Sequence, residues 1–202
     1  HIALLDTAGA IADLVKQGYV RHFGLSEMGA QTIRRANSVL PVCDLQIEYS
    51  VISRGIEERI LPTCRELGIG ISAYGVLARG LISGHWNKDR NTDARDFRTH
   101  NPRFQGDNLD RNLGLVELLR ELAEQRNVSV AQLVIAWVLA RGGDIVPLVG
   151  ARTRSRLQEA LGALDVQLGA DDLAAIERAI PVGAAAGERY NPHGMASLDS
   201  ER

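Results

Sequence analysis

Short apolar segments recur in this sequence at a spacing of about 25 residues, the length of one strand and its return helix. The first three lie at residues 19–25, 44–49 and 69–74, and stretches with helical apolar periodicity separate them. Parallel strands need a helical crossover of this kind, whereas antiparallel strands do not. The chain is therefore predicted to be an α/β protein in which consecutive strands are parallel neighbours.

The same periodicities predict the remaining elements. Helices are expected at about 7–17, 30–39, 56–67, 112–125, 130–140 and 171–179, and a fourth strand at 145–149. Ser129 and Gln132 have the spacing of a capping box. Residues 84–110 are polar and aperiodic, so we expect a long functional loop there, and residues 181–202 form a C-terminal tail. All 202 residues are expected to form a single domain.

The composition argues against several classes of function. The formal net charge is −2 and no basic stripe with aromatic residues is present, so no nucleic-acid partner is expected. No apolar run is long enough to cross a membrane. Cys43 and Cys64 lack metal or redox spacing and the histidines are scattered, so no metal site is expected. We interpret both cysteines as small buried residues of a cytoplasmic protein.

Three arginines, Arg152, Arg154 and Arg156, follow the fourth predicted strand where a helix is expected to begin. A helix N-terminus carries about half a positive charge, so basic residues there are unfavourable. On that helix Arg152 and Arg156 would also form a like-charge pair at i,i+4. Backbone N–H groups and arginines at such a junction bind phosphate. The cluster predicts an anion site, and the alternative is a solvated basic turn.

A phosphate site after the last of several β/α units is typical of the C-terminal half of a (β/α)8 barrel. Such barrels place functional residues at the carboxyl ends of their strands, where this sequence has Ser26, Gln46, Tyr49 and Tyr74. The alternative is a doubly wound sheet. The glycine-rich G-x-G-x-x-G fingerprint usual in that fold is absent from the sequence, which favours the barrel.

Five segments, at residues 18–26, 45–50, 73–84, 146–152 and 186–190, match those of one enzyme family in order and spacing. The chain resembles an aldo-keto reductase over most of its length. The resemblance implies a (β/α)8 TIM barrel of aldo-keto reductase type, of which this sequence covers about the last four to five β/α units. It also implies NADPH as the cofactor, bound extended across the barrel mouth.

The resemblance assigns roles to residues at the strand ends. Ser26 and Gln46 would hydrogen-bond the nicotinamide carboxamide, and Tyr49 would stack on the nicotinamide ring. The pyrophosphate would contact Tyr74, Gly75, Val76, Leu77, Arg79, Gly80 and Leu81, and the adenosine 2′-phosphate would contact Gly150, Arg152 and Arg156.

These residues also have structural alternatives. Ser26 and Gln46 would then satisfy backbone groups at strand ends, and Tyr49 would pack at the barrel rim. Arg79 would be a solvated side chain. The sequence departs from the family pattern at Glu27, where Asn is often found.

Catalysis in the family depends on an Asp–Tyr–Lys–His group from the first four barrel strands, and no residue here corresponds to the first three. His1 is a candidate for the His, although it precedes the first predicted helix by only about five residues. The chain alone is therefore expected to be inactive. Since it does not begin with Met, we expect it to be part of a longer polypeptide, or else to pair with a second copy as a homo-oligomer.

Four parallel strands taken from a barrel would have two unpaired edges and an open apolar face. The strand at 19–25 is accordingly expected to be uncovered or to pair with chain outside this sequence.

The leading functional hypothesis is an NADPH-dependent oxidoreductase that reduces aldehyde or ketone carbonyls to alcohols by direct hydride transfer. Its partner would be a small-molecule carbonyl substrate. The alternative is a non-catalytic, nicotinamide-cofactor-binding regulatory subunit of the same fold. A phosphate-binding aldolase or isomerase barrel ranks behind both, because Lys16 and Lys88 lie on a predicted helix and in the predicted loop rather than at strand ends.

Overall fold

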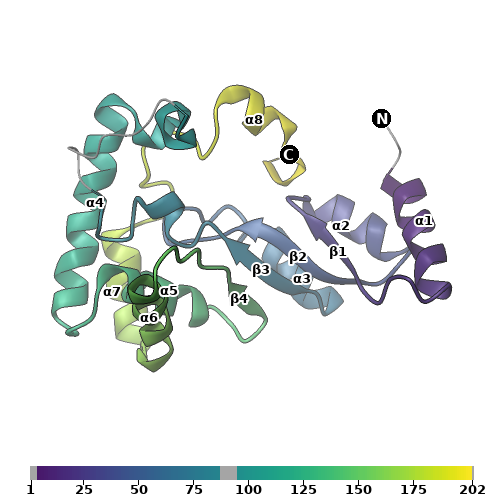
Figure 1. Ribbon diagram of the computed structural model, residues 1–202, viewed down its shortest axis with the longest axis horizontal. Helices are drawn as coiled ribbons and strands as arrows, with labels where there is room; N and C mark the ends of the chain where they lie inside the picture. Colours follow the sequence, from purple (N-terminus) through teal and green to yellow (C-terminus); the bar gives the residue numbers. More distant parts are fainter. Residues whose placement is uncertain (1–3, 87–94, 202) are drawn as a thin grey trace.

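The computed structural model describes residues 4–86 and 95–201, in which four strands form one parallel sheet (Figure 1). The strands are β1 (Phe23–Ser26), β2 (Val42–Glu48), β3 (Gly70–Tyr74) and β4 (Ile145–Pro147), and they lie side by side in chain order. Each strand is parallel to the next. The predicted α/β class with consecutive parallel neighbours is confirmed.

Helices connect the strands and extend the molecule beyond β4. In Figure 1, α1 and α2 lie at one end of the sheet and α4 to α7 at the other. The helices are α1 (Leu4–Lys16), α2 (Ala30–Asn37), α3 (Ile60–Leu67), α4 (Gly106–Glu124), α5 (Val130–Leu139), α6 (Arg154–Leu161), α7 (Ala170–Ala179) and α8 (Pro192–Ser197). Short 3-10 turns are η1 (Ala78–Gly80), η2 (Phe97–His100), η3 (Pro102–Phe104), η4 (Gly162–Asp165) and η5 (Asp199–Glu201).

Apolar residues of the strands are buried on the face of the sheet that contacts the helices. Leu45, Ile47 and Ile71 are fully or almost fully buried, and α2, α3 and α5 contact β2, β3 and β4. Successive strand residues point to opposite faces, so Gln46 and Ser72 lie on the other face. This second face is called the open face below.

The open face is mostly polar, which corrects the expectation of an open apolar face. Ser26 and Gln46 are exposed on it, and the Ser72 hydroxyl donates to Asp44 Oδ1 at 3.0 Å. Val146, which is 59% exposed, is an apolar exception. The expectation was wrong because the apolar residues of β1 to β3 alternate toward the helices and leave polar residues on the other side.

β1 is an edge strand whose strand partner in the described part of the chain is β2, and β1 does not pair with β4. The uncovered edge expected for this strand is confirmed. The sequence places the strand at 19–25, but it runs from Phe23 to Ser26, and Tyr19 is 78% exposed. Gly18, with a φ of +80°, turns the chain out of α1, so the residues just before Phe23 form a link instead of a strand.

Two other expected boundaries differ from the structure. The third helix begins at Ile60, after turns, and not at residue 56. α4 begins at Gly106, inside the stretch expected to be aperiodic, and η2 and η3 lie before it. Polar side chains stabilise these short turns, so the sequence there shows no regular spacing of apolar residues. The buried Asn101, for example, accepts a hydrogen bond from Arg103 N at 3.1 Å.

The predicted capping box of α5 is confirmed. Ser129 Oγ accepts from Gln132 N at 3.2 Å, and Gln132 Oε1 accepts from Ser129 N at 2.9 Å. Of the two cysteines, Cys64 is buried as expected, whereas Cys43 is exposed on β2. Both are free thiols.

The C-terminal part of the chain returns to the carboxyl end of β1. α8 lies above the sheet in Figure 1, and η5 follows it. Ser200 N donates to Glu27 O at 3.1 Å, and Gly29 N donates to Asp199 Oδ2 at 2.8 Å. The sequence predicts only a tail at residues 181–202, because contacts this distant in the chain leave no local pattern.

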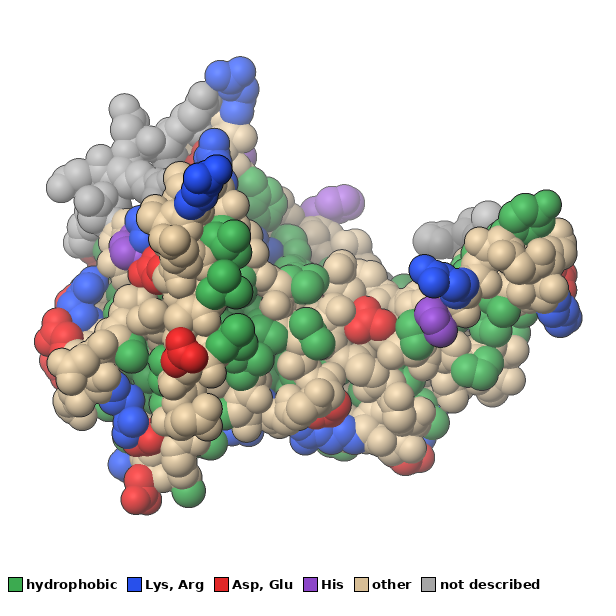
Figure 2. Space-filling model, turned by 60° about the horizontal axis from the view of Figure 1, so that its bottom comes forward, with side chains coloured by type: hydrophobic (Ala, Val, Ile, Leu, Met, Phe, Trp, Pro, Cys, Tyr) green, Lys and Arg blue, Asp and Glu red, His purple; other side chains and the backbone are tan. Residues whose placement is uncertain are grey.

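The surface in Figure 2 is hollowed between the α1 end of the molecule and the opposite end, and hydrophobic side chains gather in the half that contains α4 to α7. Exposed apolar residues of β4 and α6 include Val146, Leu157 and Leu161. No helix in the described ranges has the length and apolar character needed to cross a membrane.

Candidate functional site

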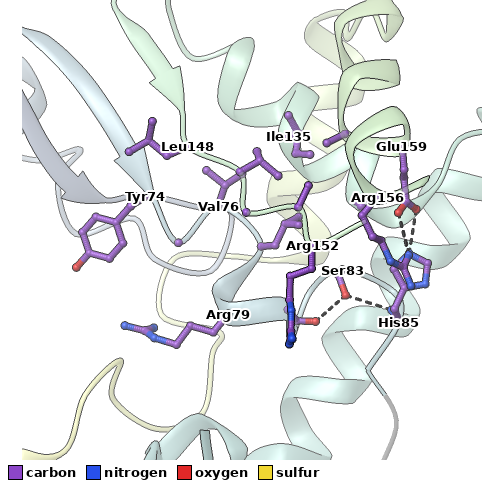
Figure 3. Close-up of a pocket in the computed structure, with 18 of the residues that line it drawn as sticks. Tyr74, Val76, Arg79, Ser83, His85, Ile135, Leu148, Arg152, Arg156 and Glu159 are labelled. Atoms are coloured by element: carbon purple, nitrogen blue, oxygen red, sulfur yellow. Dashed lines mark hydrogen bonds and ion pairs between the residues drawn. The ribbon is translucent and has the colours of Figure 1, made fainter. Parts of the chain in front are cut away.

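A cavity of about 910 Å³ opens at the carboxyl ends of β3 and β4 (Figure 3). The turn after β3 forms one wall and the turn after β4, with the start of α6, forms another. Ala131 and Ile135 of α5 and Arg98 of η2 complete the lining. The cavity therefore lies at the edge of the sheet where barrel and open α/β enzymes place their ligands.

The turn after β3 is unusually tight. Gly75, Ala78, Arg79 and Gly80 all have positive φ, between +46° and +94°. Such conformations strain residues other than glycine, and they concentrate at functional sites. A Cβ on Gly75 would lie 3.0 Å from Glu48 Cγ, so a larger residue there would also make the Glu48 side chain shift.

Most of the predicted pyrophosphate segment lines this cavity. Tyr74, Gly75, Val76, Leu77, Arg79 and Gly80 are in the lining, whereas Leu81 is not. The Leu81 side chain is fully buried in the core and anchors the turn. The structure brings these residues together with the predicted phosphate residues Gly150, Arg152 and Arg156, which line the same cavity from the other side.

The arginine-bearing junction differs in detail from the prediction. α6 begins at Arg154, and the N-cap Thr153 accepts from Arg156 N at 3.3 Å. Arg152 thus precedes the helix, so the expected like-charge pair of Arg152 and Arg156 on one helix was wrong. Both side chains still line the cavity, from the end of the turn and the first turn of α6.

The two cavity arginines have different environments. Arg156 Nη1 donates to Glu159 Oε2 at 2.9 Å, and His85 Nε2 lies 2.9 Å from the same carboxylate. Burial alone would raise the pKa of Glu159. The hydrogen bonds from His85 and Arg156 lower this pKa by more, so the net shift is downward. Arg152 has no carboxylate partner among the residues that the structure describes. The other described arginines of the cavity lining, Arg79, Arg98 and Arg156, each have a carboxylate partner, so Arg152 is the one most available to an added anion.

Tyr49 is not at the cavity, which corrects its assigned stacking role. Its side chain is fully buried, its hydroxyl donates to Glu57 at 2.6 Å, and its ring centroid lies 5.5 Å from that of Trp137. Burial raises the pKa of the Tyr49 hydroxyl well above its usual value. The strand period gives the signal that sequence reasoning missed. Gln46 and Tyr49 are three residues apart, so an extended chain puts them on opposite faces.

Tyr74 is the tyrosine that lines the cavity (Figure 3). Its hydroxyl donates to Glu27 Oε1 at 2.7 Å and lies 3.0 Å from the Tyr190 hydroxyl. Burial and these hydrogen bonds raise the pKa of Tyr74 far above its usual value. The phenol is therefore a poor proton donor, and its ring is held as part of the wall.

Ser26 and Gln46 are paired in register on the open face, and Gln46 is paired in turn with Ser72. They do not line the cavity itself. Two residues further along β2 and β3, Glu48 pairs with Tyr74. Gln46 thus lies two residues before the position that pairs with Tyr74, and Ser26 lies beside Gln46 on β1, so the role of both residues stays a prediction.

A buried group of opposite charges lies behind Tyr74, and sequence reasoning did not find it. The side chain of Glu48 is fully buried, with Arg79, Arg103 and Arg189 nitrogens at 3.2, 3.6 and 3.5 Å. Burial lowers the pKa of Arg103. The sequence did contain a signal for this group. Glu48 is a charged residue between the apolar Ile47 and Tyr49 in a strand expected to be buried, and buried charges need partners.

Arg79 is half-buried and paired with Glu48, not solvated. Its guanidinium carbon also lies 4.7 Å from the Tyr190 ring centroid and 5.4 Å from that of Phe97. His1, the catalytic candidate, is outside the described residues. No group of three or more metal-ligating side chains occurs in the part of the chain that the structure covers.

Comparisons with known proteins agree with this geometry. The sequence model of the Aldo/keto reductase family matches residues 2–181. The chain is 42% identical over 189 residues to a probable aldo-keto reductase 1 of Glycine max, covering 94% of this chain and 54% of that protein. It is 36% identical over 197 residues to the aldo-keto reductase str7 of Strobilurus tenacellus, covering 96% and 59%.

Solved structures are similar as well. A glycerol dehydrogenase of Gluconobacter oxydans superposes with a TM-score of 0.81 at 27% identity, over 87% of this chain and 54% of that one. A thermostable aldo-keto reductase solved with the inhibitor epalrestat shares the fold, with a TM-score of 0.67 at 22% identity over 88% and 55%. The chain spans between a half and two thirds of the length of each of these proteins.

Proposed function

Because this chain belongs to the aldo/keto reductase family, a family of oxidoreductases, we propose that it binds NADPH for the reduction of aldehyde or ketone carbonyls. The observation that supports this proposal is a single cavity with two chemically different ends. Figure 3 shows Tyr74 at one end and Arg156 with His85 at the other, with Arg152 between them.

The lining residues fit an extended dinucleotide phosphate. Arg152 and Arg156 supply two guanidinium groups for a phosphate ester, and arginine binds phosphate in a bidentate way. The cavity volume of about 910 Å³ is at the upper end for small-molecule sites. Tyr74 and Leu148 provide an apolar wall for a flat ring.

NADPH, when bound, supplies the hydride for the carbonyl carbon. The described residues bind and orient: Arg152 and Arg156 fix the phosphate end, and the turn after β3 fixes the middle. Tyr74 does not donate a proton, because its hydroxyl is already committed to Glu27. We therefore propose that turnover needs residues beyond this sequence, and that this chain alone binds the cofactor without oxidising it.

The proposal includes a cytoplasmic location and a small-molecule carbonyl substrate, with no nucleic-acid partner. Two free cysteines, Cys43 and Cys64, support the reducing compartment. Association with a second copy of the chain stays a prediction.

Cofactor titration tests the proposal. Quenching of the fluorescence of Trp86 and Trp137 reports binding of NADPH and of NADH, which lacks the 2′-phosphate. We expect NADPH to bind more tightly.

Arg152→Met should weaken NADPH binding about tenfold, or about 1.4 kcal/mol, and leave NADH binding unchanged. Equal affinity of the unaltered protein for both nucleotides would overturn the proposal. A complete polypeptide that binds NADPH but reduces no carbonyl would favour the regulatory subunit instead.

A further inference from the structure

The carboxylate of Glu27 accepts hydrogen bonds from four different residues. Arg189 donates to both oxygens, at 3.0 and 2.7 Å, and the Ser200 hydroxyl donates at 2.6 Å. The Tyr74 hydroxyl donates at 2.7 Å and Glu48 N at 2.9 Å. Glu27 thus joins the ends of β1, β2 and β3 to residues 189–201, called the C-terminal segment below.

The backbone at Glu27 is held as firmly as its side chain. Glu27 has a φ of +53°, a conformation that L-residues rarely adopt. Its N–H donates to Gln46 O at 3.0 Å, and its carbonyl accepts from Ser200 N at 3.1 Å. A Cβ on Gly29 would lie 2.8 Å from Asp199 O, so the C-terminal segment packs directly on this turn. Such strain persists only where surrounding contacts determine it.

The Glu27–Arg189 pair is nearly dry, with side-chain exposures of 12% and 9%. Burial raises the pKa of Glu27, but hydrogen bonds from Arg189, Ser200 and Tyr74 lower it to about 2. Glu27 is therefore ionised at neutral pH and only accepts hydrogen bonds. The Tyr74 hydroxyl must then donate to Glu27, which fixes the hydroxyl and restricts rotation of the ring.

Tyr74 carries this constraint into the cavity, because its ring lines the end opposite Arg156 (Figure 3). We propose that Glu27, held by Arg189 of the C-terminal segment, positions the Tyr74 ring as the wall for the nicotinamide half of the cofactor. Glu27 and Arg189 are positioning residues that act through Tyr74. This inference rests on the proposed function and adds a role for a segment far from the cavity in the sequence.

The test uses two probes on the intact protein. NADPH carries both a nicotinamide and an adenosine 2′-phosphate, whereas adenosine 2′,5′-bisphosphate carries only the second. Glu27→Gln, Arg189→Met and Tyr74→Phe should each weaken NADPH binding about tenfold and leave bisphosphate binding within about twofold. The double variant Glu27→Gln/Tyr74→Phe should bind NADPH no more weakly than either single variant, because both remove the same constraint.

Controls separate this inference from the proposed function and from general destabilisation. Arg34→Met removes another bidentate arginine–glutamate pair, the exposed one with Glu66 between α2 and α3, and should change neither affinity. Arg189→Lys keeps a donor and should restore part of the NADPH affinity. Equal losses for both probes, or unchanged NADPH binding in the Glu27 and Arg189 variants while Arg152→Met weakens it, would overturn the inference alone. Failure of the unaltered protein to bind NADPH would overturn the proposed function.

Discussion

Two guanidinium groups lie over the ring of the buried Trp137, with Arg54 at 5.3 Å and Arg141 at 5.1 Å from its centroid. Tyr49 packs against this ring, and Glu57 accepts hydrogen bonds from both Tyr49 and Arg54. Arg54 thus neutralises the partly buried Glu57 carboxylate, and the Tyr49 and Trp137 rings pack together in the core. Tyr49 is therefore a structural residue.

Tyr49→Phe removes one hydrogen bond to Glu57 and leaves the Arg54 contacts in place. We expect a loss of about 1 kcal/mol in the free energy of unfolding, measured by urea denaturation, and no change in NADPH affinity. Tyr74→Phe, in contrast, should weaken NADPH binding about tenfold in addition to the stability lost with its hydrogen bond to Glu27. A tenfold loss of NADPH affinity in Tyr49→Phe at unchanged stability would contradict this assignment.

At the scale of elements, the turn between β3 and η1 shapes the cavity wall. Gly75 opens this turn with a φ of +67°, and a Cβ there would lie only 3.0 Å from Glu48 Cγ. Gly114 makes a suitable contrast, since it lies inside α4 and a Cβ on it would meet no atom within 4 Å.

Gly75→Ala should lower the free energy of unfolding by about 1–3 kcal/mol, because alanine is strained at positive φ and contacts Glu48. Gly114→Ala should raise it by about 0.5–1 kcal/mol, because alanine is the better helix former. Thermal and urea unfolding of the two variants measure the difference. Equal effects at both positions would show that the tight turn is not required.

For the whole molecule, the Glu27–Arg189 pair joins the carboxyl end of β1 to the C-terminal segment, across 162 residues of sequence. The pair is a long-range contact whose strength depends on the charge of Glu27. Stability should consequently depend on pH through this one carboxyl group more than through exposed carboxylates.

The pKa of Glu27 falls from 4.5 to about 2 on folding. A lowered pKa contributes stability above the unfolded value, and that contribution is lost as pH falls from about 4.5 toward 2. Because the carboxylate keeps some contact with water, we expect a contribution on the order of 2 kcal/mol at neutral pH. Glu27→Gln should flatten the dependence of urea stability on pH in this window. An unchanged slope in the variant would show that other carboxylates control acid unfolding.

The order of parallel strands, the capping box at Ser129 and the arginine-bearing junction could all be read from the sequence. Each is set by neighbouring residues: strand and helix periods, a three-residue cap spacing, and charges beside a turn. The face on which Tyr49 lies could also have been predicted, since side chains alternate along a strand and Tyr49 is three residues from Gln46.

The identity of the cavity's aromatic wall and the role of the C-terminal segment were decided only by tertiary structure. Glu27 and Arg189 show no local pattern that joins them, and their pairing exists only because folding removes both from water and brings β1 against the chain end. Sequence alone determines features that depend on contacts a few residues apart. Contacts across 162 residues depend on how the layers pack, and only the folded chain specifies them.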